Sequence, residues 1–384
     1  MTLVLALVAL AFALLPAILA CANLIALRTP EPEAAQDGLV SILIPARDEE
    51  GTIVDTVRAA LASTGIAVEV LVGDDHSTDG TAGLVRALAQ TDPRLRLVPV
   101  PALPEGWTGK NHACAALAAE ARGGQLLFID ADVSLAPSAA AGLVAHARAT
   151  GAALVSAVPR QIMRSLGERL TVPMINFLLV GYLPVPMMRA SLRPALGAAC
   201  GQLVLIDRSV YGETGGHGAI RGLLHDGVFL PRILRHAGHR TDLVAGHALA
   251  TCRMYRNLAE SWAGFSKNAH EGMATPRALP VWTLLLLAGH VLPLLLVLAA
   301  AFGLATPTAG LVALAALVVS LATRAAITLI THEPAATILL HPLGVVVALA
   351  IQWNVLLDPK RAGAAVWKGR SYPVKGTKTP HSQP

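Results

Sequence analysis

The stretch Gln125–Val133, QLLFIDADV, decides the fold of this chain. Four consecutive large apolar residues, Leu126–Ile129, predict a strand buried on both faces, and this strand runs directly into Asp130 and Asp132. Two carboxylates at that position are costly unless a positive group neutralises them, and open parallel sheets bind ligands at this edge. Hard divalent cations prefer carboxylate oxygens, so the pattern predicts a metal site that binds a diphosphate. The alternative is a surface turn in which Asp132 caps the next helix.

Three further short apolar stretches predict strands at Leu39–Pro45, Val68–Val72 and Arg94–Pro99. Helical segments follow the first two of these strands, at Thr52–Leu61 and at about Thr81–Gln90. Strands that alternate with helices of this length are typical of α/β proteins. We therefore expect a layered, Rossmann-like domain with a mostly parallel sheet.

Polar and acidic residues gather where these strands end. Pro45-Ala46-Arg47-Asp48-Glu49-Glu50 follows the first strand, and Asp74-Asp75-His76-Ser77-Thr78-Asp79-Gly80-Thr81 follows the second. Before the fourth strand, the loop Pro104–Cys114 (PEGWTGKNHAC) offers Lys110, a point charge suited to phosphate. The loop lacks the Walker A spacing, and a solvated loop lysine is the alternative. The recurrence at strand ends favours a binding edge, because a purely structural sequence would scatter such residues.

Hydrophobic residues make up 54% of the chain and charged residues 14%, and the apolar excess lies at the two ends. Thr2–Leu27 carries no charge and, at about 1.5 Å per residue, is long enough to cross a bilayer. We expect residues 1–28 to be a signal anchor whose carboxyl end is cytoplasmic, because Arg28 follows it. A cleaved signal or lipoprotein peptide is the alternative, although the segment lacks a basic start and exceeds the usual length.

A second membrane region is expected over residues 279–357. Leu279–Leu304 and Pro307–Ile330 are each long enough to cross, whereas polar residues interrupt Thr337–Leu357 and favour a re-entrant or interfacial segment. Residues 358–384 form a basic tail, which we expect to be cytoplasmic and to face anionic lipid.

Residues 163–188 mix apolar side chains with arginine and proline, which is typical of interfacial helices lying on a membrane. Four scattered cysteines show no metal-ligand spacing and predict reduced thiols without a disulfide framework. The formal net charge of +5 is concentrated near the carboxyl terminus, which favours contact with lipid headgroups and no nucleic-acid partner.

The motifs PARDE at Pro45, DDxSxDGT at Asp74, GWTGK at Gly106 and DxD at Asp130 occur in an order that resembles family 2 glycosyltransferases of the GT-A fold. The resemblance covers roughly Leu39–Asn268, so we expect a GT-A domain over residues 39–270. It is nearest to membrane-bound, lipid-modifying members of the family, namely carotenoid, hopanoid-associated and ceramide glycosyltransferases. Trp367-Lys368-Gly369-Arg370 also resembles a motif of these members.

This resemblance implies roles for individual residues. Asp75 would meet the nucleotide base, and Lys110 would lie near the diphosphate. Asp132 would be the chief ligand of Mg²⁺ or Mn²⁺, with Asp130 helping. The nucleotide pocket would be lined by Pro45, Arg47 and Glu49.

The second half of the soluble region would carry the acceptor side. Small residues at Gly197–Gln202 (GAACGQ), including Cys200, Gly201 and Gln202, would let a bulky acceptor approach the backbone. The resemblance implies that Asp226, which begins a predicted helix through Arg235, is the catalytic base, while the alternative is a helix cap. His225 replaces the glutamate that the family usually has beside this base. Tyr211–His217 predicts a Gly-rich turn, for which an ordinary loop is the alternative.

The segment Trp262–Asn268 is expected either in the acceptor site through Trp262 or in an interfacial helix. Together these features predict an inverting, metal-dependent transfer of a sugar from a nucleotide donor, UDP-hexose favoured, to a membrane lipid at the cytoplasmic leaflet of the cell membrane. The alternatives are a polysaccharide synthase and, because of His225, a catalytically weak nucleotide-binding scaffold.

Overall fold

The computed structural model describes residues 1–31, 35–358, 364–367 and 370–373. The chain divides into two compact units. We call Ala26–Ile162 with Val185–Met254 the sheet unit. The helical unit contains Met1–Ile25, Met163–Pro184 and the described residues from Tyr255 onward.

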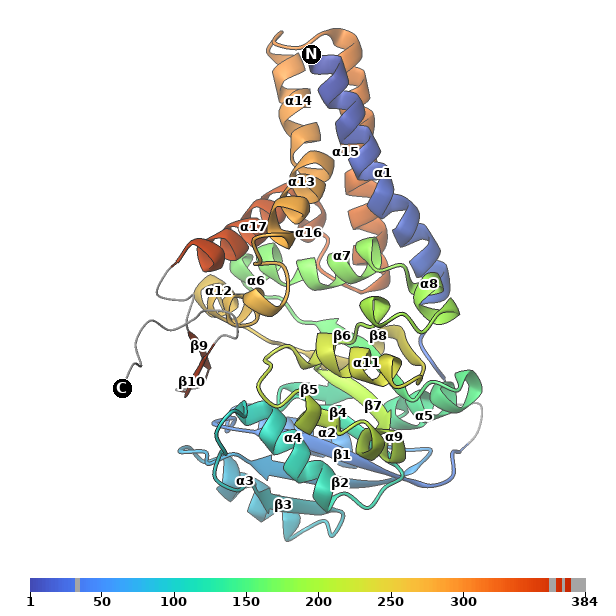
Figure 1. The fold of residues 1–384 in the computed structure, drawn as a ribbon, viewed down its shortest axis with the longest axis vertical. Coiled ribbons are helices and arrows are strands. Elements are labelled where there is room, and N and C mark those ends of the chain that lie inside the picture. Colours follow the sequence, from blue (N-terminus) through green and yellow to red (C-terminus); the bar gives the residue numbers. More distant parts are fainter. Residues whose placement is uncertain (32–34, 359–363, 368–369, 374–384) are drawn as a thin grey trace, which may run out of the picture. The chain divides into compact units, whose positions relative to one another are not determined.

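An eight-stranded sheet in the order β3-β2-β1-β4-β7-β6-β8-β5 is the centre of the sheet unit (Figure 1). The first four strands pair in parallel, as the sequence predicts, whereas β7 is antiparallel to both β4 and β6. Leu126–Ile129 are buried as expected. The strands are β1 (Leu39–Ala46), β2 (Ala67–Asp74), β3 (Leu95–Pro99), β4 (Gln125–Ile129), β5 (Val133–Leu135), β6 (Leu154–Gln161), β7 (Leu203–Asp207) and β8 (Thr241–Cys252).

Helices cover both faces of this sheet, because alternate strand residues point to opposite sides. One face packs against α2 (Ile53–Leu61), α3 (Thr81–Ala89) and α5 (Ala139–Thr150). The other face packs against α4 (Gly109–Glu120), α9 (Arg208–Glu213), α10 (Gly216–Ala219) and α11 (Asp226–His236). The short α8 (Val185–Ala190) and η1 (Pro194–Leu196) complete the unit. The carboxyl ends of β1, β2 and β4 therefore share one edge of the sheet.

The helical unit contains the apolar helices. α1 (Thr2–Ala26) and α15 (Pro307–Ile330) are each long and apolar enough to cross a membrane. The expected single span Leu279–Leu304 is instead two helices, α13 (Ala278–His290) and α14 (Leu292–Ala301), bent by 40°. Pro293 explains the break, because proline lacks the N–H that would continue the helix and disfavours helical geometry in the residue before it.

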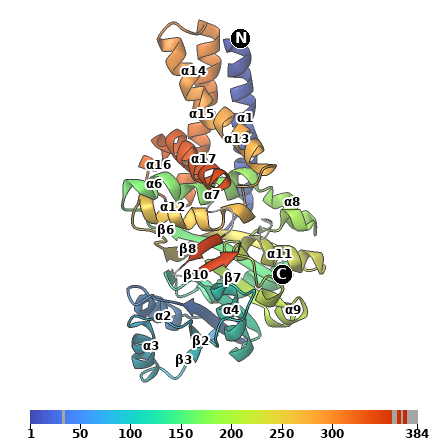
Figure 2. The same ribbon diagram turned by 60° about the vertical axis from the view of Figure 1, so that its left-hand side comes forward.

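Small residues let the apolar helices approach closely. Ala6 of α1 packs with Leu296 of α14 and with Ala309 and Ala313 of α15, and Figures 1 and 2 both show these three helices side by side. A Cβ on Gly289 would lie 2.9 Å from the carbonyl oxygen of Phe12, so α13 meets α1 at a glycine. The remaining elements are α6 (Leu166–Thr171), α7 (Pro173–Tyr182), α12 (Leu258–Lys267), η2 (Ala269–Glu271), α16 (Ala336–Leu339), α17 (His341–Leu357), β9 (Ala364–Trp367) and β10 (Arg370–Pro373).

Helix length limits what the shorter apolar elements can do. The helices α6, α7 and α8, which occupy the segment expected to be interfacial, have 6, 10 and 6 residues. Each is far shorter than the roughly 20 residues that a crossing needs. With 17 residues, α17 is also shorter than a full span. Most of the expected basic tail, including Lys368 and Gly369, lies outside the described residues.

Candidate active site

The Asp130–Asp132 turn joins β4 to β5. The Val133 N–H donates to the Asp130 carbonyl oxygen at 3.0 Å, and Thr56 Oγ1 on α2 donates to the Ala131 carbonyl oxygen at 2.8 Å. Strand pairing on both sides and this contact from α2 hold the turn. Its two carboxylates are therefore positioned by the sheet edge that the sequence predicts to bind ligands.

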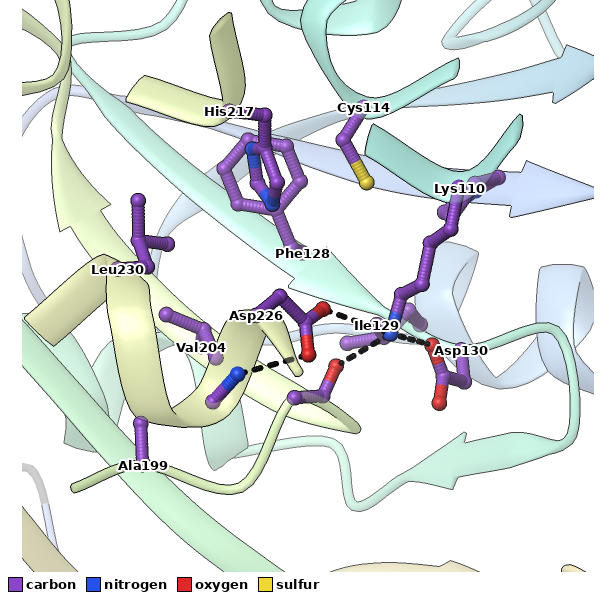
Figure 3. Close-up of a pocket in the computed structure, with 13 residues that line it drawn as sticks. Lys110, Cys114, Phe128, Ile129, Asp130, Ala199, Val204, His217, Asp226 and Leu230 are labelled. Atoms are coloured by element: carbon purple, nitrogen blue, oxygen red, sulfur yellow. Dashed lines mark hydrogen bonds and ion pairs between the residues drawn. The ribbon is translucent and has the colours of Figure 1, made fainter. Parts of the chain in front are cut away.

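Lys110, on the first turn of α4, joins three parts of the site (Figure 3). Its Nζ lies 2.7 Å from Asp130 Oδ1 and 3.0 Å from Asp226 Oδ2, and it donates to the Gly201 carbonyl oxygen at 3.1 Å. Burial disfavours the charged ammonium, but Asp130 and then Asp226 outweigh burial and hold the pKa of Lys110 well above its usual value. The lysine is therefore charged and uses all three of its N–H donors.

Asp226 begins α11 with its carboxylate 14% exposed. Burial opposes ionisation, yet Lys110 and then His217 lower the pKa of Asp226 to about 2. A Cβ on Gly201 would lie 2.3 Å from Asp226 Oδ1, so glycine at that position makes room for the carboxylate. Gly227 has a similar role, because its Cβ would lie 2.4 Å from the Ala199 carbonyl oxygen. The small-residue stretch before β7 thus accommodates the carboxylate of Asp226.

The first turn of α4, with its N-cap Thr108, also anchors the turn before Asp226. The Thr108 N–H donates to the Arg221 carbonyl oxygen at 2.7 Å. Asn111 Nδ2 donates to the carbonyl oxygens of Ile220 and Leu223 at 2.8 and 2.7 Å. Sequence reasoning missed this role of Asn111, which stands directly after Lys110. Lys110 and Asp226 are 116 positions apart in the sequence, and these contacts to the backbone bring them together.

A small cavity of about 10 Å³ lies beside the Lys110–Asp226 pair (Figure 3). Its volume suits about one water molecule. Apart from its polar residues, the cavity is lined by apolar side chains, which include Cys114, Phe128, Val204 and Leu230. The wall near α11 is therefore mainly apolar, and its low local dielectric strengthens the electrostatic interactions of Asp226.

His217 also lines this cavity, and sequence reasoning missed it by treating Tyr211–His217 as a turn. Its Nδ1 lies 2.9 Å from the Tyr211 hydroxyl, and its ring meets Phe128 edge-on at 4.7 Å. Burial lowers the pKa of His217 to about 4 despite the opposing effect of Asp226, so the imidazole is neutral at pH 7. The signal in the sequence was the preceding glycine pair, since a Cβ on Gly216 would collide with the Tyr211 ring.

Asp132 differs from Asp130 in its surroundings. Burial, followed by the charges of Asp130 and Glu49, raises the pKa of Asp132 to about 7. Its Oδ1 is buried without a hydrogen-bond partner. Within the described residues no group of three or more His, Cys, Asp or Glu side chains forms a complete metal-ligand set. Two carboxylates with an unpartnered oxygen nevertheless fit Mg²⁺ or Mn²⁺, which keep positions for water and phosphate.

The residues expected around the nucleotide lie together at the ends of β1 and β2. Arg47 Nη1 donates to the Asp75 carbonyl oxygen at 2.7 Å, and the Asp75 side chain is buried. The Glu49 N–H donates to Thr81 Oγ1 at 2.8 Å, and Pro45 lines the small cavity. These contacts cross-link the two strand-end loops. These contacts therefore fix the shape of this edge of the sheet.

The acceptor-side residues of the sheet unit form a second network. Gln202 is buried, accepts from Gln161 Nε2 at 2.9 Å and contacts Cys252 Sγ at 3.1 Å. The Cys200 N–H donates to Ser156 Oγ at 2.8 Å. His225 directly precedes Asp226, and Trp262 lies on α12 of the helical unit. The structure thus places Gly201 and His225 next to Asp226, whereas Cys200 and Gln202 contact β6 and β8.

Comparison with known proteins identifies the sheet unit. Residues 41–215 match the model of glycosyl transferase family 2. Over residues 41–215 the chain carries a family 2 glycosyltransferase domain. The matched residues include every residue from Pro45 to Asp132 that the sequence predicts to bind the nucleotide or the metal. The match ends before Asp226. Family membership thus covers the donor side of the site and leaves the assignment of the base to geometry.

Curated relatives are similar over part of their length. The 4,4'-diaponeurosporenoate glycosyltransferase of Staphylococcus haemolyticus is 26% identical over 229 residues, which are 58% of this chain and 60% of the relative. A succinoglycan biosynthesis protein of Rhizobium meliloti is 36% identical over 113 residues, which are 29% of this chain and 31% of that protein. The chain therefore matches less than two thirds of the length of either relative.

The fold is shared more widely than the sequence. A mannosyltransferase from Pyrobaculum calidifontis, solved with GDP-Man and Mn²⁺, superimposes with a TM-score of 0.58 at 20% identity. The match covers 94% of this chain and 100% of that one. The GT-A fold expected from the sequence is confirmed for the family 2 domain, and two helices of the chain are apolar enough to span a membrane.

Proposed function

We propose that this chain transfers a sugar, with inversion, from a nucleoside diphosphate donor to a hydroxyl group of a membrane lipid. The observation that carries the proposal is the ammonium shared by Asp130 and Asp226, at 2.7 and 3.0 Å. One carboxylate belongs to the donor-side turn and the other to the helix expected to carry the base. A donor and an acceptor bound at these two groups would meet within one small region.

The reaction follows from these positions. The acceptor oxygen attacks the anomeric carbon while Asp226 takes the proton from that oxygen. The bond between the anomeric carbon and the diphosphate oxygen breaks, and its electron pair stays on the diphosphate. Bound at Asp130 and Asp132, Mg²⁺ or Mn²⁺ would neutralise charge on this leaving group. Arg47, Glu49 and Asp75 at the neighbouring strand ends would hold the nucleotide, with uracil as the favoured base.

The chemistry of the acceptor decides whether a base is needed. A hydroxyl keeps its proton at pH 7, so its attack requires a carboxylate such as Asp226. A lipid carboxylate, as in the acid named in the staphylococcal relatives, is already ionised near pH 7. An anionic acceptor would also be repelled by Asp226 and Asp130. The geometry therefore favours a lipid hydroxyl as the acceptor.

Partial identity to a succinoglycan biosynthesis protein supports a polysaccharide synthase as the second candidate. Against it, the described residues provide two candidate spans, or three if the bent pair counts as one. This is little material from which to build a channel for a growing polymer. The product's size separates the two candidates, because a lipid glycosyltransferase adds one sugar and a synthase makes a polymer.

Purified chain in detergent micelles, given radiolabelled UDP-hexose, Mn²⁺ and a bacterial lipid extract, tests the proposal. We expect a labelled product that extracts into organic solvent. Asp132→Asn should abolish Mn²⁺-dependent binding of the donor, and Asp130→Asn should weaken it less. Unchanged Mn²⁺ dependence in both variants would refute the metal site. A wild type that binds UDP but never cleaves the donor would point to a nucleotide-binding scaffold.

The proposed membrane arrangement has its own test. A reporter inserted into the linker after α1 should score cytoplasmic, because nucleotide sugars are made in the cytoplasm. A reporter after Pro384 should also score cytoplasmic if α17 is re-entrant or interfacial. A periplasmic score at the linker contradicts the proposed function. A periplasmic score at the tail alone makes α17 a crossing segment.

A further inference from the structure

Lys110 pairs with Asp130, one of the two carboxylates of the proposed cation site. We propose that Lys110 is a built-in counter-ion that competes with the divalent cation for Asp130, so that the cation binds well only when an arriving diphosphate gives the ammonium new oxygen partners. The inference rests on the proposed function, because it takes Asp130 and Asp132 as the cation site. It assigns Lys110 a positioning role in addition to the expected place near the diphosphate.

The hydrogen bonds of Lys110 leave none of its donors for a phosphate. Its ammonium has three N–H groups, and Asp130, Asp226 and the Gly201 carbonyl oxygen take one each. Contact with a diphosphate therefore requires the ammonium to leave one of these partners. Asp130 is the partner to be given up, because its side chain is 31% exposed and that of Asp226 is 14% exposed. Water can replace the ammonium more readily at the more exposed carboxylate.

The charges around Lys110 also favour an exchange. Asp130 and Asp226 both contact the ammonium, and the charges of Asp130 and Glu49 act on Asp132. This part of the site thus holds four carboxyl groups and one lysine. A doubly charged cation at Asp130 would lie within a few Å of the ammonium and repel it strongly. The two positive groups cannot both bind Asp130 at full strength.

The residue type at position 110 suits a side chain that can be released from Asp130. Lys110 is the single lysine among the first 266 residues, where every other permanently charged basic side chain is arginine. An arginine would form rigid, paired hydrogen bonds to a carboxylate. A lysine places a compact charge on a flexible stem and can move from one partner to another by rotating that stem. The residue type therefore fits a contact that must break during the catalytic cycle.

Mn²⁺ binding to the full chain in detergent, measured by electron paramagnetic resonance without nucleotide, tests the proposal. In Lys110→Met we expect Mn²⁺ to bind on the order of tenfold more tightly than in wild type. The reason is that the variant removes the repulsion between the cation and one positive charge, and tenfold corresponds to about 1.4 kcal/mol. The increase should disappear in the Asp130→Asn background, where there is no contact to compete for. Arg94→Gln, which removes one positive charge from an exposed ion pair in the same unit, should leave Mn²⁺ affinity unchanged.

Other outcomes overturn the proposal. Unchanged or weaker Mn²⁺ binding in Lys110→Met does so, and so does an equal increase in Arg94→Gln. A wild type that binds no Mn²⁺ overturns both this inference and the proposed metal site. Competition for Asp130 without any sugar transfer would instead leave the inference standing and refute the proposed function alone.

A measurement on the unaltered chain covers the case in which Lys110→Met does not fold. The rate of acetylation of Lys110 by a small reagent, followed by mass spectrometry, should decrease when Mg²⁺ and UDP are added together, because the ammonium then donates to diphosphate oxygens that cover it and keep it protonated. Mg²⁺ added alone should change the rate little, because the ammonium then stays on Asp130. Lys267, on α12 of the helical unit, provides the internal control, and its rate should not change. An unchanged or faster rate at Lys110 in the presence of both Mg²⁺ and UDP would contradict the proposal.

Discussion

Two charged networks, the Arg324–Glu333 pair of the helical unit and the Lys110 site of the sheet unit, differ in their balance of charge. In the helical unit, Arg324 on α15 pairs with Glu333, and both side chains are fully buried. Asn176 Nδ2 donates to the same glutamate at 2.7 Å, and Arg324 Nη1 donates to the Pro173 carbonyl oxygen at 3.1 Å. One cation therefore meets one anion. In the sheet unit a single lysine faces several carboxylates.

The balance of charge distinguishes a network that supports the fold from one that is suited to binding a cation. Burial costs both networks desolvation energy, and only opposite charge and hydrogen bonds offset that cost. The Arg324–Glu333 pair has no net charge and links α15 to α7 through Pro173 and Asn176. The site around Lys110 keeps an excess of negative charge at an accessible sheet edge. Such an excess is suited to binding a cation and a cationic transition state.

The largest expected effect comes from breaking the balanced network. Glu333→Ala should cost roughly 3–5 kcal/mol of unfolding free energy, because it leaves the Arg324 charge buried without its partner. Denaturant unfolding in detergent micelles measures this. The double variant Arg324→Met with Glu333→Leu should recover most of the loss. A cost below about 1 kcal/mol for Glu333→Ala would show that this network does not support the fold.

Asp226→Asn should reduce turnover at least about 100-fold, since the amide cannot take the acceptor proton. Affinity for the UDP-sugar should change little, because asparagine is nearly the same size and its Oδ1 can still accept from the Gly227 N–H, as Asp226 Oδ1 does at 2.7 Å. Asp207→Asn is the matched control, since Asp207 caps α9 away from the cavity. Normal turnover of Asp226→Asn would mean that Asp226 is only a cap, or that the acceptor is a carboxylate.

A second balanced network, in the sheet unit, predicts a pH effect on stability. Asp242 on β8 contacts His146 Nε2 at 2.9 Å and Arg189 Nε at 2.8 Å. Burial opposes its ionisation, but these two partners outweigh burial and lower the pKa of Asp242. The folded state therefore holds this proton less tightly than the unfolded chain. The resulting stability is complete above the ordinary Asp pKa of 3.8 and is lost as the pH falls below it.

Unfolding free energy measured from about pH 6 to about pH 3 tests this expectation. Asp242→Asn should lower stability at the upper end of that range and flatten the dependence. Arg189 also donates to the Ala26 carbonyl oxygen at 2.9 Å. An unchanged pH profile in the variant would show that other carboxylates govern acid unfolding.

The smallest expected effect concerns backbone strain beside the nucleotide loops. His76 has a φ of 57°, in the left-handed region that favours glycine. Its side chain is exposed and makes a long 3.4 Å contact with the Pro101 carbonyl oxygen. His76→Gly should therefore be more stable than His76→Ala by about 1 kcal/mol, because alanine keeps the strained Cβ. Equal melting temperatures for the two variants would contradict this explanation.

The sequence by itself determined the elements and the order of the motifs. Three expected strands and one expected helix form within one or two residues of their predicted limits. They are the strands at Leu39–Pro45, Val68–Val72 and Gln125–Asp130 and the helix at Thr52–Leu61. These features are local, since a buried apolar run and the polar residues that end it are neighbours in the chain. The parallel pairing of the first four strands also follows from short helical crossovers.

The tertiary structure alone decided which groups meet. The antiparallel return of β7 beside β4 depends on long-range packing, and it brings Gly201 and Gln202 next to Asp130. The contact of Lys110 with Asp226 depends on the carbonyl oxygens that Asn111 binds, and these are backbone atoms with no signature in the sequence. His217 became part of the site because burial against Phe128 places it there. Local patterns specify what each segment can form, whereas the site needs distant segments whose pairing only the packed fold determines.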